Sequence, residues 1–359
     1  MINVTKTFLP PLDEYQAIVS RAWETGWITN RGVLVQELEA KLKTYLGVKH
    51  IIATTNGTLP IQIAIKALAL KGEIITTPFS YVATTSSIVW EACTPVFVDI
   101  HPEYLTIDDT KIEAAITPNT SAILATHVFG NPCHIEAIEA IAKKHHLKVI
   151  YDAAHCFGVS YKGQSVFNFG DVSTCSFHAT KVFHTGEGGT MITNNSKLHE
   201  TLFHHHNFGH DGSEAFHGIG INAKMSELQA AMGLAVLPYF DEIIRNRKAI
   251  VDQYNEGLKE TNLKMLKIRT HTDWNYCYFP VIFKTEAVLI KVKEALEAQK
   301  VFTRRYFYPS LDTLPYIDVS DNKCQVSRAI ASTVLCLPLY VGLNEEAIQM
   351  IINTIKKNL

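Results

Sequence analysis

Short runs of β-branched residues alternate with longer amphipathic segments from residue 48 to residue 194, and no other feature constrains the fold as much. Such runs are typical of strands that are buried on both faces, and the segments between them have apolar residues at helical spacing. The alternation predicts an α/β domain with a mostly parallel sheet between helices. Seven runs are expected to form its strands, at residues 50–54, 73–78, 95–100, 121–129, 148–154, 172–177 and 188–194.

The length of 359 residues exceeds one ordinary domain and is short for three, so we expect a large domain and a smaller one. Residues 1–240 are predicted to form the large α/β domain, with the N-terminal segment included, and residues 241–359 a small C-terminal α+β domain. A long helical stretch lies at this boundary, and its Pro238 predicts a break or kink.

The charge balance gives no electrostatic signal for nucleic acid or an anionic membrane, because 33 lysines and arginines face 35 aspartates and glutamates. The first residues lack the pattern of a signal peptide, and no later apolar run is long enough to span a bilayer. Seven cysteines are scattered without a CxxC pair, which fits neither a disulfide framework nor a zinc site. We therefore expect a cytoplasmic protein with small-molecule partners, no nucleic acid and no membrane.

Four histidines lie close together in the stretch "FHHHNFGH", at positions 204, 205, 206 and 210. Consecutive residues of a helix point about 100° apart, so at most two of the first three could share an ion. We therefore expect a solvated or packed helix end and no metal site.

Asp152 stands at the carboxyl end of the expected strand 148–154, the edge at which α/β sheets bind ligands. It could cap the next helix or serve a site together with Lys181. That lysine lies among small, apolar and glycine residues in "SFHATKVFHTGEGG". A dry, neutral pocket disfavours its ammonium form, which leaves an amine able to form a Schiff base with an aldehyde.

Pyridoxal phosphate is an aldehyde of this kind, and its ring needs a carboxylate facing the pyridine nitrogen to act as an electron sink. Lys181 and Asp152 would supply these two functions as the catalytic residues. The phosphate needs donors at a helix N-terminus, and Asn56, Gly57 and Thr58 lie between a strand and a helix, although Asn-Gly is also common in turns. Tyr81 could stack on the ring, and Phe79 is better explained by packing.

With these motifs in place, the chain resembles the DegT/DnrJ/EryC1/StrS sugar aminotransferases, a branch of the fold-type I pyridoxal phosphate enzymes. The resemblance covers nearly the whole length, and it implies that Lys181 forms the Schiff base and that Asp152 contacts the pyridine nitrogen. It rests on "GWITNRGVLVQELEAKL", "TTNGT", "TPFSYVATTSSI", "VFVDI", "IYDAAHCFG", "SFHATKVFHTGEGG" and "GINAKMSELQAAMG".

The resemblance also implies roles for the other pocket residues. His155, a glutamine in many members, would hydrogen-bond the phenolic oxygen of the cofactor, and Ala154 and Tyr81 would pack on its two faces. Asn222 would reach the phosphate from a second subunit, which implies a homodimer with shared active sites. The remaining phosphate contacts would come from Gly57, Thr58 and Ser176.

The implied reaction runs in two halves, with pyridoxamine phosphate as the intermediate form of the cofactor. L-Glutamate would give the amino group, and a nucleotide-linked keto-deoxysugar would accept it. Residues 304–316 resemble enzymes that aminate C4 of dTDP-4-keto-6-deoxy-D-glucose, giving a dTDP-4-amino-4,6-dideoxy sugar for a polysaccharide or natural product. Family members that dehydrate sugars have histidine in place of the Schiff-base lysine, so Lys181 favours transamination.

Three alternatives are weighed against this reaction. The first is amination at C3 of a dTDP-3-keto-6-deoxyhexose, and the second is a non-catalytic regulator of the same fold that binds cofactor or sugar nucleotide. The third is a nicotinamide oxidoreductase, which the lack of GxGxxG after the first expected strand disfavours.

Substrate contacts are expected at Thr29, Lys224, Arg304, Tyr306 and Tyr308. Arg304 and the adjacent Arg305 could meet a diphosphate or form a solvated basic pair. Lys224 replaces the arginine of the usual "GxNxRM" pattern and cannot make its bidentate contact. His184 replaces an asparagine common in the family, and the sequence assigns it no role.

Overall fold

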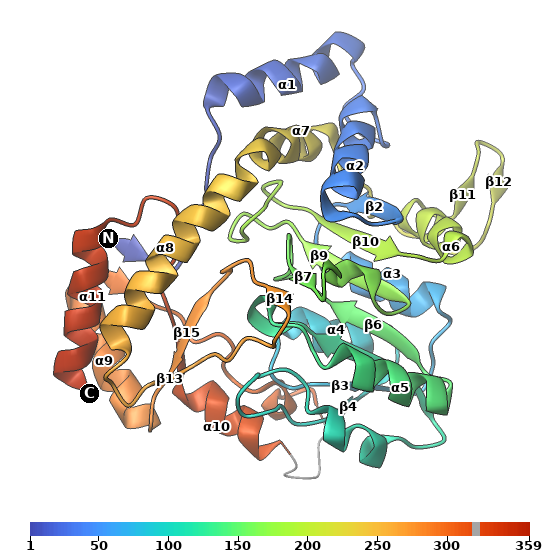
Figure 1. The fold of residues 1–359 in the computed structure, drawn as a ribbon. Helices are drawn as coiled ribbons and strands as arrows, with labels where there is room; N and C mark the ends of the chain where they lie inside the picture. Colours follow the sequence, from blue (N-terminus) through green and yellow to red (C-terminus); the bar gives the residue numbers. More distant parts are fainter. Residues whose placement is uncertain (318–323) are drawn as a thin grey trace.

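The computed structural model describes residues 1–317 and 324–359. Its centre is a seven-stranded sheet of order β2-β10-β9-β6-β5-β3-β4, with helices on both sides (Figure 1). All of its strand pairs are parallel except the two of β10, which runs antiparallel to β2 and β9. The predicted mostly parallel sheet is therefore confirmed. Its strands are β2 (His50–Thr54), β3 (Glu73–Thr76), β4 (Thr94–Phe97), β5 (Thr120–Thr126), β6 (Lys148–Asp152), β9 (Val172–Ser176) and β10 (Gly189–Thr193).

The strands of this sheet are buried on both faces, as their continuous apolar runs predict. In β5, Ile123 and Ala125 pack into one apolar cluster and Ala122 and Leu124 into another, because successive side chains of a strand point to opposite faces. The first cluster includes residues of α2 (Val33–Leu46), α5 (Ile135–His145) and α7 (Glu227–Val236), and the second residues of α3 (Leu59–Ala67), α4 (Val82–Trp90) and α6 (Ser196–His206).

The C-terminal part packs around its own apolar cluster, in which Leu289 and Ile351 are fully buried. Its sheet has the order β13-β15-β17. The elements of this part are α8 (Phe240–Leu258), α9 (Glu286–Ala298), α10 (Gln325–Thr333), α11 (Glu345–Asn358), β13 (Lys264–Met265), β15 (Phe279–Ile282), β16 (Val301–Phe302) and β17 (Val334–Leu337).

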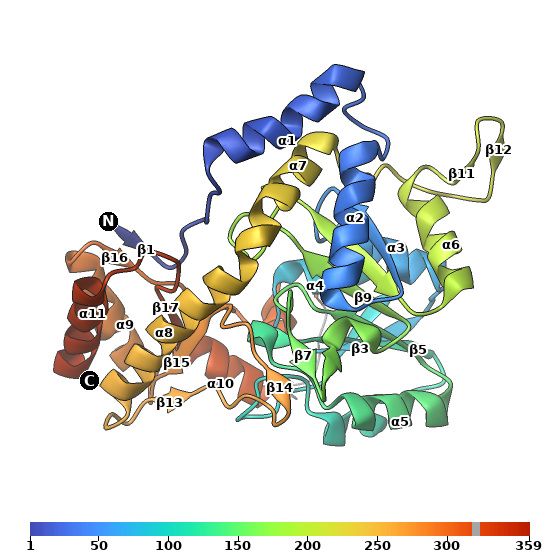
Figure 2. The same cartoon turned by 45° about the horizontal axis from the view of Figure 1, so that its top comes forward.

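The first strand, β1 (Ile2–Asn3), pairs in parallel with β16. Figure 2 shows it beside β16 and α11, far along the chain. From there the chain runs back towards the central sheet and forms α1 (Leu12–Thr25). The first residues therefore pack with the C-terminal part, although they are grouped with the large domain in the sequence-based division, and the boundary at residue 240 stays a prediction.

The expected break at Pro238 is confirmed, because a 3-10 turn (Leu237–Tyr239) separates α7 from α8. Among the described residues, no helix has the length and apolar character needed to cross a membrane. A hairpin of β11 (His210–Asp211) and β12 (Ala215–Phe216) extends away from the body (Figure 1). The remaining short strands, β7 (Ser160–Tyr161), β8 (Gln164–Ser165) and β14 (Thr272–Asp273), form a small separate sheet.

Candidate active site

A cavity of about 660 Å³ lies at the carboxyl edge of the central sheet. Residues at or directly after the ends of β2, β5, β6 and β9 line it, which is where α/β sheets place their ligands. The fold thus brings together residues from distant parts of the sequence. Ten of the predicted site residues line this cavity, namely Gly57, Thr58, Tyr81, Asp152, Ala154, His155, Ser176, Lys181, Arg304 and Tyr306.

Four predicted residues, Thr29, Asn222, Lys224 and Tyr308, do not line the cavity of the single chain. Asn222 is exposed, and its Oδ1 accepts a 2.7 Å hydrogen bond from Lys224 Nζ. The role predicted for Asn222 requires a second subunit, and Lys224 lies beside it. Thr29 is exposed between α1 and α2, and Tyr308 stacks against the Arg305 guanidinium, 3.7 Å away. The roles of these four residues stay predictions.

Asp152 is almost fully buried at the end of β6, and both of its oxygens accept hydrogen bonds. Thr84 Oγ1 donates to Oδ2 at 2.6 Å, and the Ala154 backbone N–H donates to Oδ1 at 3.1 Å. Burial, the largest influence, raises the pKa of the Asp152 carboxyl, while these two hydrogen bonds and the charge of Lys181 lower it. The carboxylate is therefore held in one orientation at the floor of the cavity.

A row of hydroxyl groups leads to this carboxylate. Ser80 Oγ lies 2.7 Å from Thr84 Oγ1 and 3.0 Å from Thr126 Oγ1. Because the single hydroxyl proton of Thr84 goes to Asp152, Ser80 must donate to Thr84 and accept from Thr126. Each hydrogen bond polarises the next, which strengthens the donor that faces the carboxylate.

Lys181 extends from the loop between β9 and β10, and its Nζ lies 5.8 Å from the centre of the Tyr278 ring. Burial lowers the pKa of its ammonium, and nearby Cys277 is the first of several groups that act against this. Burial thus shifts this lysine towards the amine that the sequence predicts, relative to a lysine in water.

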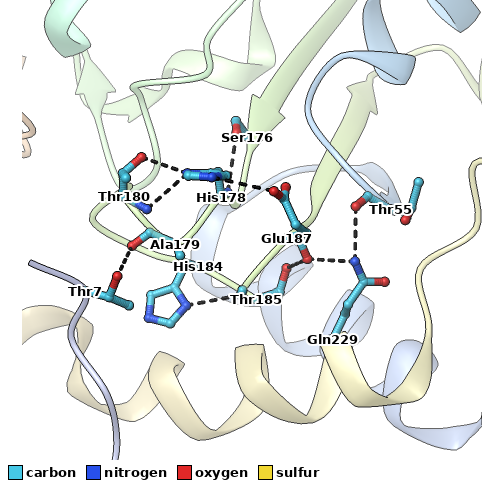
Figure 3. Close-up of polar contacts among 11 residues, drawn as sticks. Thr7, Thr55, Ser176, His178, Ala179, Thr180, His184, Thr185, Glu187 and Gln229 are labelled. Carbon is cyan, nitrogen blue, oxygen red and sulfur yellow. Dashed lines mark hydrogen bonds and ion pairs between the residues drawn. The ribbon is translucent and has the colours of Figure 1, made fainter.

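Residues 177–188 form the loop that carries this lysine, called the lysine loop below. The backbone hydrogen bonds that close it include one from Ala179 N–H to the Gly186 carbonyl at 2.7 Å and one from Thr185 N–H to the Phe177 carbonyl at 2.9 Å. Figure 3 shows the polar contacts around it. The loop thus presents its lysine from a closed, hydrogen-bonded frame.

His155 is buried, and its surroundings fix its tautomer. The Phe129 backbone N–H donates to Nδ1 at 3.1 Å, so Nδ1 is an acceptor and the proton of the neutral ring is on Nε2. Burial, assisted by the charge of Lys181, holds the pKa of this imidazole well below its ordinary value. His155 therefore offers a neutral N–H donor to the cavity, which suits the phenolic oxygen of the predicted cofactor.

Gly57 and Ser176 form a narrow cradle at another part of the cavity. A Cβ on Gly57 would stand 2.6 Å from Ser176 Cβ, so only glycine fits there. Asn56 Oδ1 accepts hydrogen bonds from the N–H groups of Thr58 and Leu59 at 2.9 Å each and so caps α3. The Gly57 amide and the Thr58 hydroxyl have no hydrogen-bond partner among the described residues, and they stay available to an anion.

Sequence reasoning missed several residues that line the cavity or support it. His178 and Glu187 line it, with His178 Nε2 3.5 Å from Glu187 Oε1, and both lie inside the stretch that drew attention to the lysine. Thr84 and Ser80 lie in "TPFSYVATTSSI", a stretch in which the sequence suggests roles for the aromatic residues alone. Tyr278 and Phe307 come from the C-terminal part, and no local motif marks them.

This donor set fits pyridoxal phosphate. A buried carboxylate, an amine with a lowered pKa, a neutral imidazole N–H and a cradle closed to any Cβ surround one cavity. These groups match the pyridine nitrogen, the aldehyde, the phenolic oxygen and the phosphate of that cofactor. In the described parts of the chain, no group of three or more histidine, cysteine or carboxylate side chains is arranged to hold a metal ion.

Known proteins give an independent view of this chain. It is 42% identical to a dTDP-4-amino-4,6-dideoxy-D-glucose transaminase of Shigella dysenteriae, over 99% of this chain and 98% of that protein. A transaminase of the same name from Escherichia coli is 38% identical, over 97% of this chain and 96% of that protein. The crystal structure of DesI in the presence of its TDP-sugar product has a TM-score of 0.94 and 32% identity, over 99% of this chain and 92% of that one. A family model matches residues 12–356, and the chain belongs to the DegT/DnrJ/EryC1/StrS aminotransferase family.

Proposed function

We propose that this chain uses pyridoxal phosphate to move the amino group of L-glutamate to C4 of dTDP-4-keto-6-deoxy-D-glucose. The observation that carries the chemistry is the presence of Lys181 and Asp152 in one cavity, each with a pKa shifted by burial. The names of the two similar transaminases support the choice of the sugar and of C4 as the carbon that receives the amino group. DesI, with its TDP-sugar product, supports the nucleotide.

When bound, the cofactor supplies an aldehyde for the amino group and a ring that draws off electrons. Lys181 Nζ, whose pKa is lowered by burial, would take the proton from the α-carbon of L-glutamate, and in the second half it would deliver a proton to C4 of the sugar. Asp152 holds a negative charge at the floor of the cavity through its bonds to Thr84 and Ala154. His155 Nε2 donates its proton to an oxygen without becoming charged itself.

The visible spectrum of the purified protein loaded with pyridoxal phosphate tests the cofactor. We expect an absorbance band from the lysine-bound cofactor that disappears when L-glutamate is added and is missing in Lys181→Ala. The proposal is contradicted if the protein cannot be loaded with pyridoxal phosphate, or if Lys181→Ala has the same spectrum as the wild type. The product made from dTDP-4-keto-6-deoxy-D-glucose and L-glutamate is then identified by NMR, and amination of a dTDP-3-keto-6-deoxyhexose in place of this substrate would favour the alternative regiochemistry.

We also propose that two copies of the chain form a dimer in which Asn222 of each completes the phosphate site of the other. Support comes from its exposed position outside the cavity of its own chain, where it forms an isolated backbone bridge with Asn207. Mixed subunits test this arrangement. Lys181→Ala and Asn222→Ala should each have low activity, whereas an equal mixture should regain about a quarter of the wild-type value, because one site in each mixed dimer is intact. A mixture no more active than its components speaks against shared sites.

A further inference from the structure

His184 lies three positions after Lys181 and is 1% exposed, with both ring nitrogens hydrogen-bonded. The Gly186 N–H donates to Nδ1 at 3.2 Å, which makes Nδ1 an acceptor. The ring proton is therefore on Nε2, which donates to the Phe8 carbonyl at 2.6 Å. One side chain thus connects the lysine loop to the N-terminal segment, residues 2–8.

A second hydrogen bond joins the same two segments on the other side of the lysine. Thr7 Oγ1 donates to the Ala179 carbonyl at 2.9 Å, and Figure 3 shows this pair next to His184. Ala179 precedes Lys181 by two residues and His184 follows it by three. Residues 7 and 8 therefore hold the lysine loop on both sides of its functional residue.

The other end of the N-terminal segment is fixed to the C-terminal part. Ile2 pairs with Val301 and Asn3 with Phe302 in parallel register, and the Leu339 N–H donates to the Val4 carbonyl at 3.1 Å. The chain after Phe302 soon reaches Arg304 and Tyr306, which line the cavity from the C-terminal part. One short segment thus contacts both the loop that carries the lysine and the strand that leads to the cavity-lining residues Arg304 and Tyr306.

We propose that His184 is a positioning residue, which clamps the N-terminal segment to the lysine loop and so sets the spacing between Lys181 and the wall that contains Arg304. The effect on catalysis rests on the proposed aminotransferase function, but the clamp itself does not. A displacement of about 1 Å in a reacting group can lower a rate by about a hundredfold. A connection of this kind therefore bears on the rate as well as on stability.

Three substitutions separate hydrogen bonding from space filling. His184→Phe keeps an aromatic ring and removes both hydrogen bonds. His184→Gln keeps an amide donor at about the reach of Nε2, and His184→Asn keeps an acceptor near Nδ1 only. The clamp predicts that glutamine preserves the contact with Phe8 and that phenylalanine and asparagine lose it.

Hydrogen–deuterium exchange on the full-length protein, as purified, reads the clamp directly. In His184→Phe the amides of residues 2–8 and 177–188 should exchange about tenfold faster, with no change in α5, because local openings expose hydrogen-bonded amides. His184→Gln should stay within about threefold of wild type in residues 2–8. Wild-type exchange in His184→Phe would show that the ring only fills space, and faster exchange throughout the chain would show a general structural role; either result overturns the proposal.

Thr7→Val gives a second test that leaves the buried histidine intact. It removes one hydrogen bond to the lysine loop and should speed exchange in residues 177–188 about threefold. Thr5→Val is its matched control, because Thr5 lies in the same segment and its side chain has no hydrogen-bond partner among the described residues. Equal exchange in the two valine variants would overturn the clamp.

Kinetics then separate this proposal from the proposed function. His184→Phe should lower kcat about tenfold, whether the concentration of the amino acceptor or that of the amino donor is varied. It should raise the KM for the sugar nucleotide and leave the KM for L-glutamate within about twofold. An unchanged kcat overturns the positioning role. A wild-type protein without aminotransferase activity would contradict the proposed function alone, since the exchange measurement would still decide whether the clamp exists.

Discussion

Thr84 Oγ1 lies 2.6 Å from Asp152 Oδ2, and this hydrogen bond joins α4 to the end of β6 at the floor of the cavity. It is one of the influences that lower the pKa of a carboxyl whose burial raises it. The helix over the sheet therefore helps to keep the negative charge that the proposed chemistry requires.

Replacing Thr84 by valine should raise the pKa of Asp152 further, because the carboxylate loses a donor and stays buried. A carboxylate that must be ionised loses its function as the pH falls through its pKa. The acid limb of the kcat/KM profile should therefore move to higher pH, and activity at neutral pH should fall about tenfold. Thr85→Val is the matched control, since Thr85 Oγ1 is buried and has no hydrogen-bond partner among the described residues. Equal profiles for the two variants would rule out this role of Thr84.

Substituting Gly57 by alanine should weaken cofactor binding at least tenfold, because the new Cβ would lie 2.6 Å from Ser176 Cβ. Titration of the protein with pyridoxal phosphate, followed by absorbance, measures the change. The double variant Gly57→Ala, Ser176→Gly removes the clashing Cβ and should recover part of the affinity. If the double variant binds no better than Gly57→Ala, the steric explanation is wrong.

Arg304 and Arg305 should differ in their effect on the sugar nucleotide. Arg304 lines the cavity, whereas Arg305 bonds to Glu286 at 2.6 Å and to the Ser332 carbonyl at 2.9 Å. Arg304→Gln should raise the KM for the sugar nucleotide about tenfold or more, because a charge-assisted hydrogen bond to a phosphate is lost. Arg305→Gln should leave that KM near the wild-type value. The expected assignment fails if both variants raise the KM alike.

Buried His127 should make the protein less stable in acid. Burial lowers its pKa from 6.5 to about 3, so the unfolded chain binds the proton more tightly than the folded one. The stabilisation is complete above pH 6.5 and is lost as the pH falls towards 3, at about 2 kcal/mol between pH 6.5 and pH 5. His127→Asn keeps an acceptor for the Cys133 N–H, which is 3.0 Å from Nδ1, and cannot be protonated.

Urea unfolding at pH 7 and pH 5 measures this difference. The free energy of unfolding should decrease less between these pH values in His127→Asn than in the wild type, by about 2 kcal/mol. Comparing the change in the free energy of unfolding between the two pH values cancels the pH-independent cost of the smaller side chain. Parallel losses in the two proteins would show that His127 does not contribute to acid sensitivity.

The sequence by itself determined the central sheet and the position of its ligand edge. Continuous apolar runs predict strands buried on both faces. Asp152 lies at the end of one of these strands and Lys181 follows another, so a parallel sheet places them at one edge. The sequence also indicates the cradle at Gly57, because a glycine directly after a strand can be recognised from neighbouring residues alone. Those features depend on residues close together in the chain, so the spacing of apolar and polar residues is enough to predict them.

Only the tertiary structure decided which side chains meet across the chain. Thr84 reaches Asp152 across 68 positions, and His184 reaches the Phe8 carbonyl across 176. The adjacent arginines 304 and 305 read alike in the sequence, yet one lines the cavity and the other is held by Glu286. Such contacts depend on how helices and the N-terminal segment pack against the sheet, and packing is set by the shapes of surfaces that are distant in sequence, which no local pattern encodes.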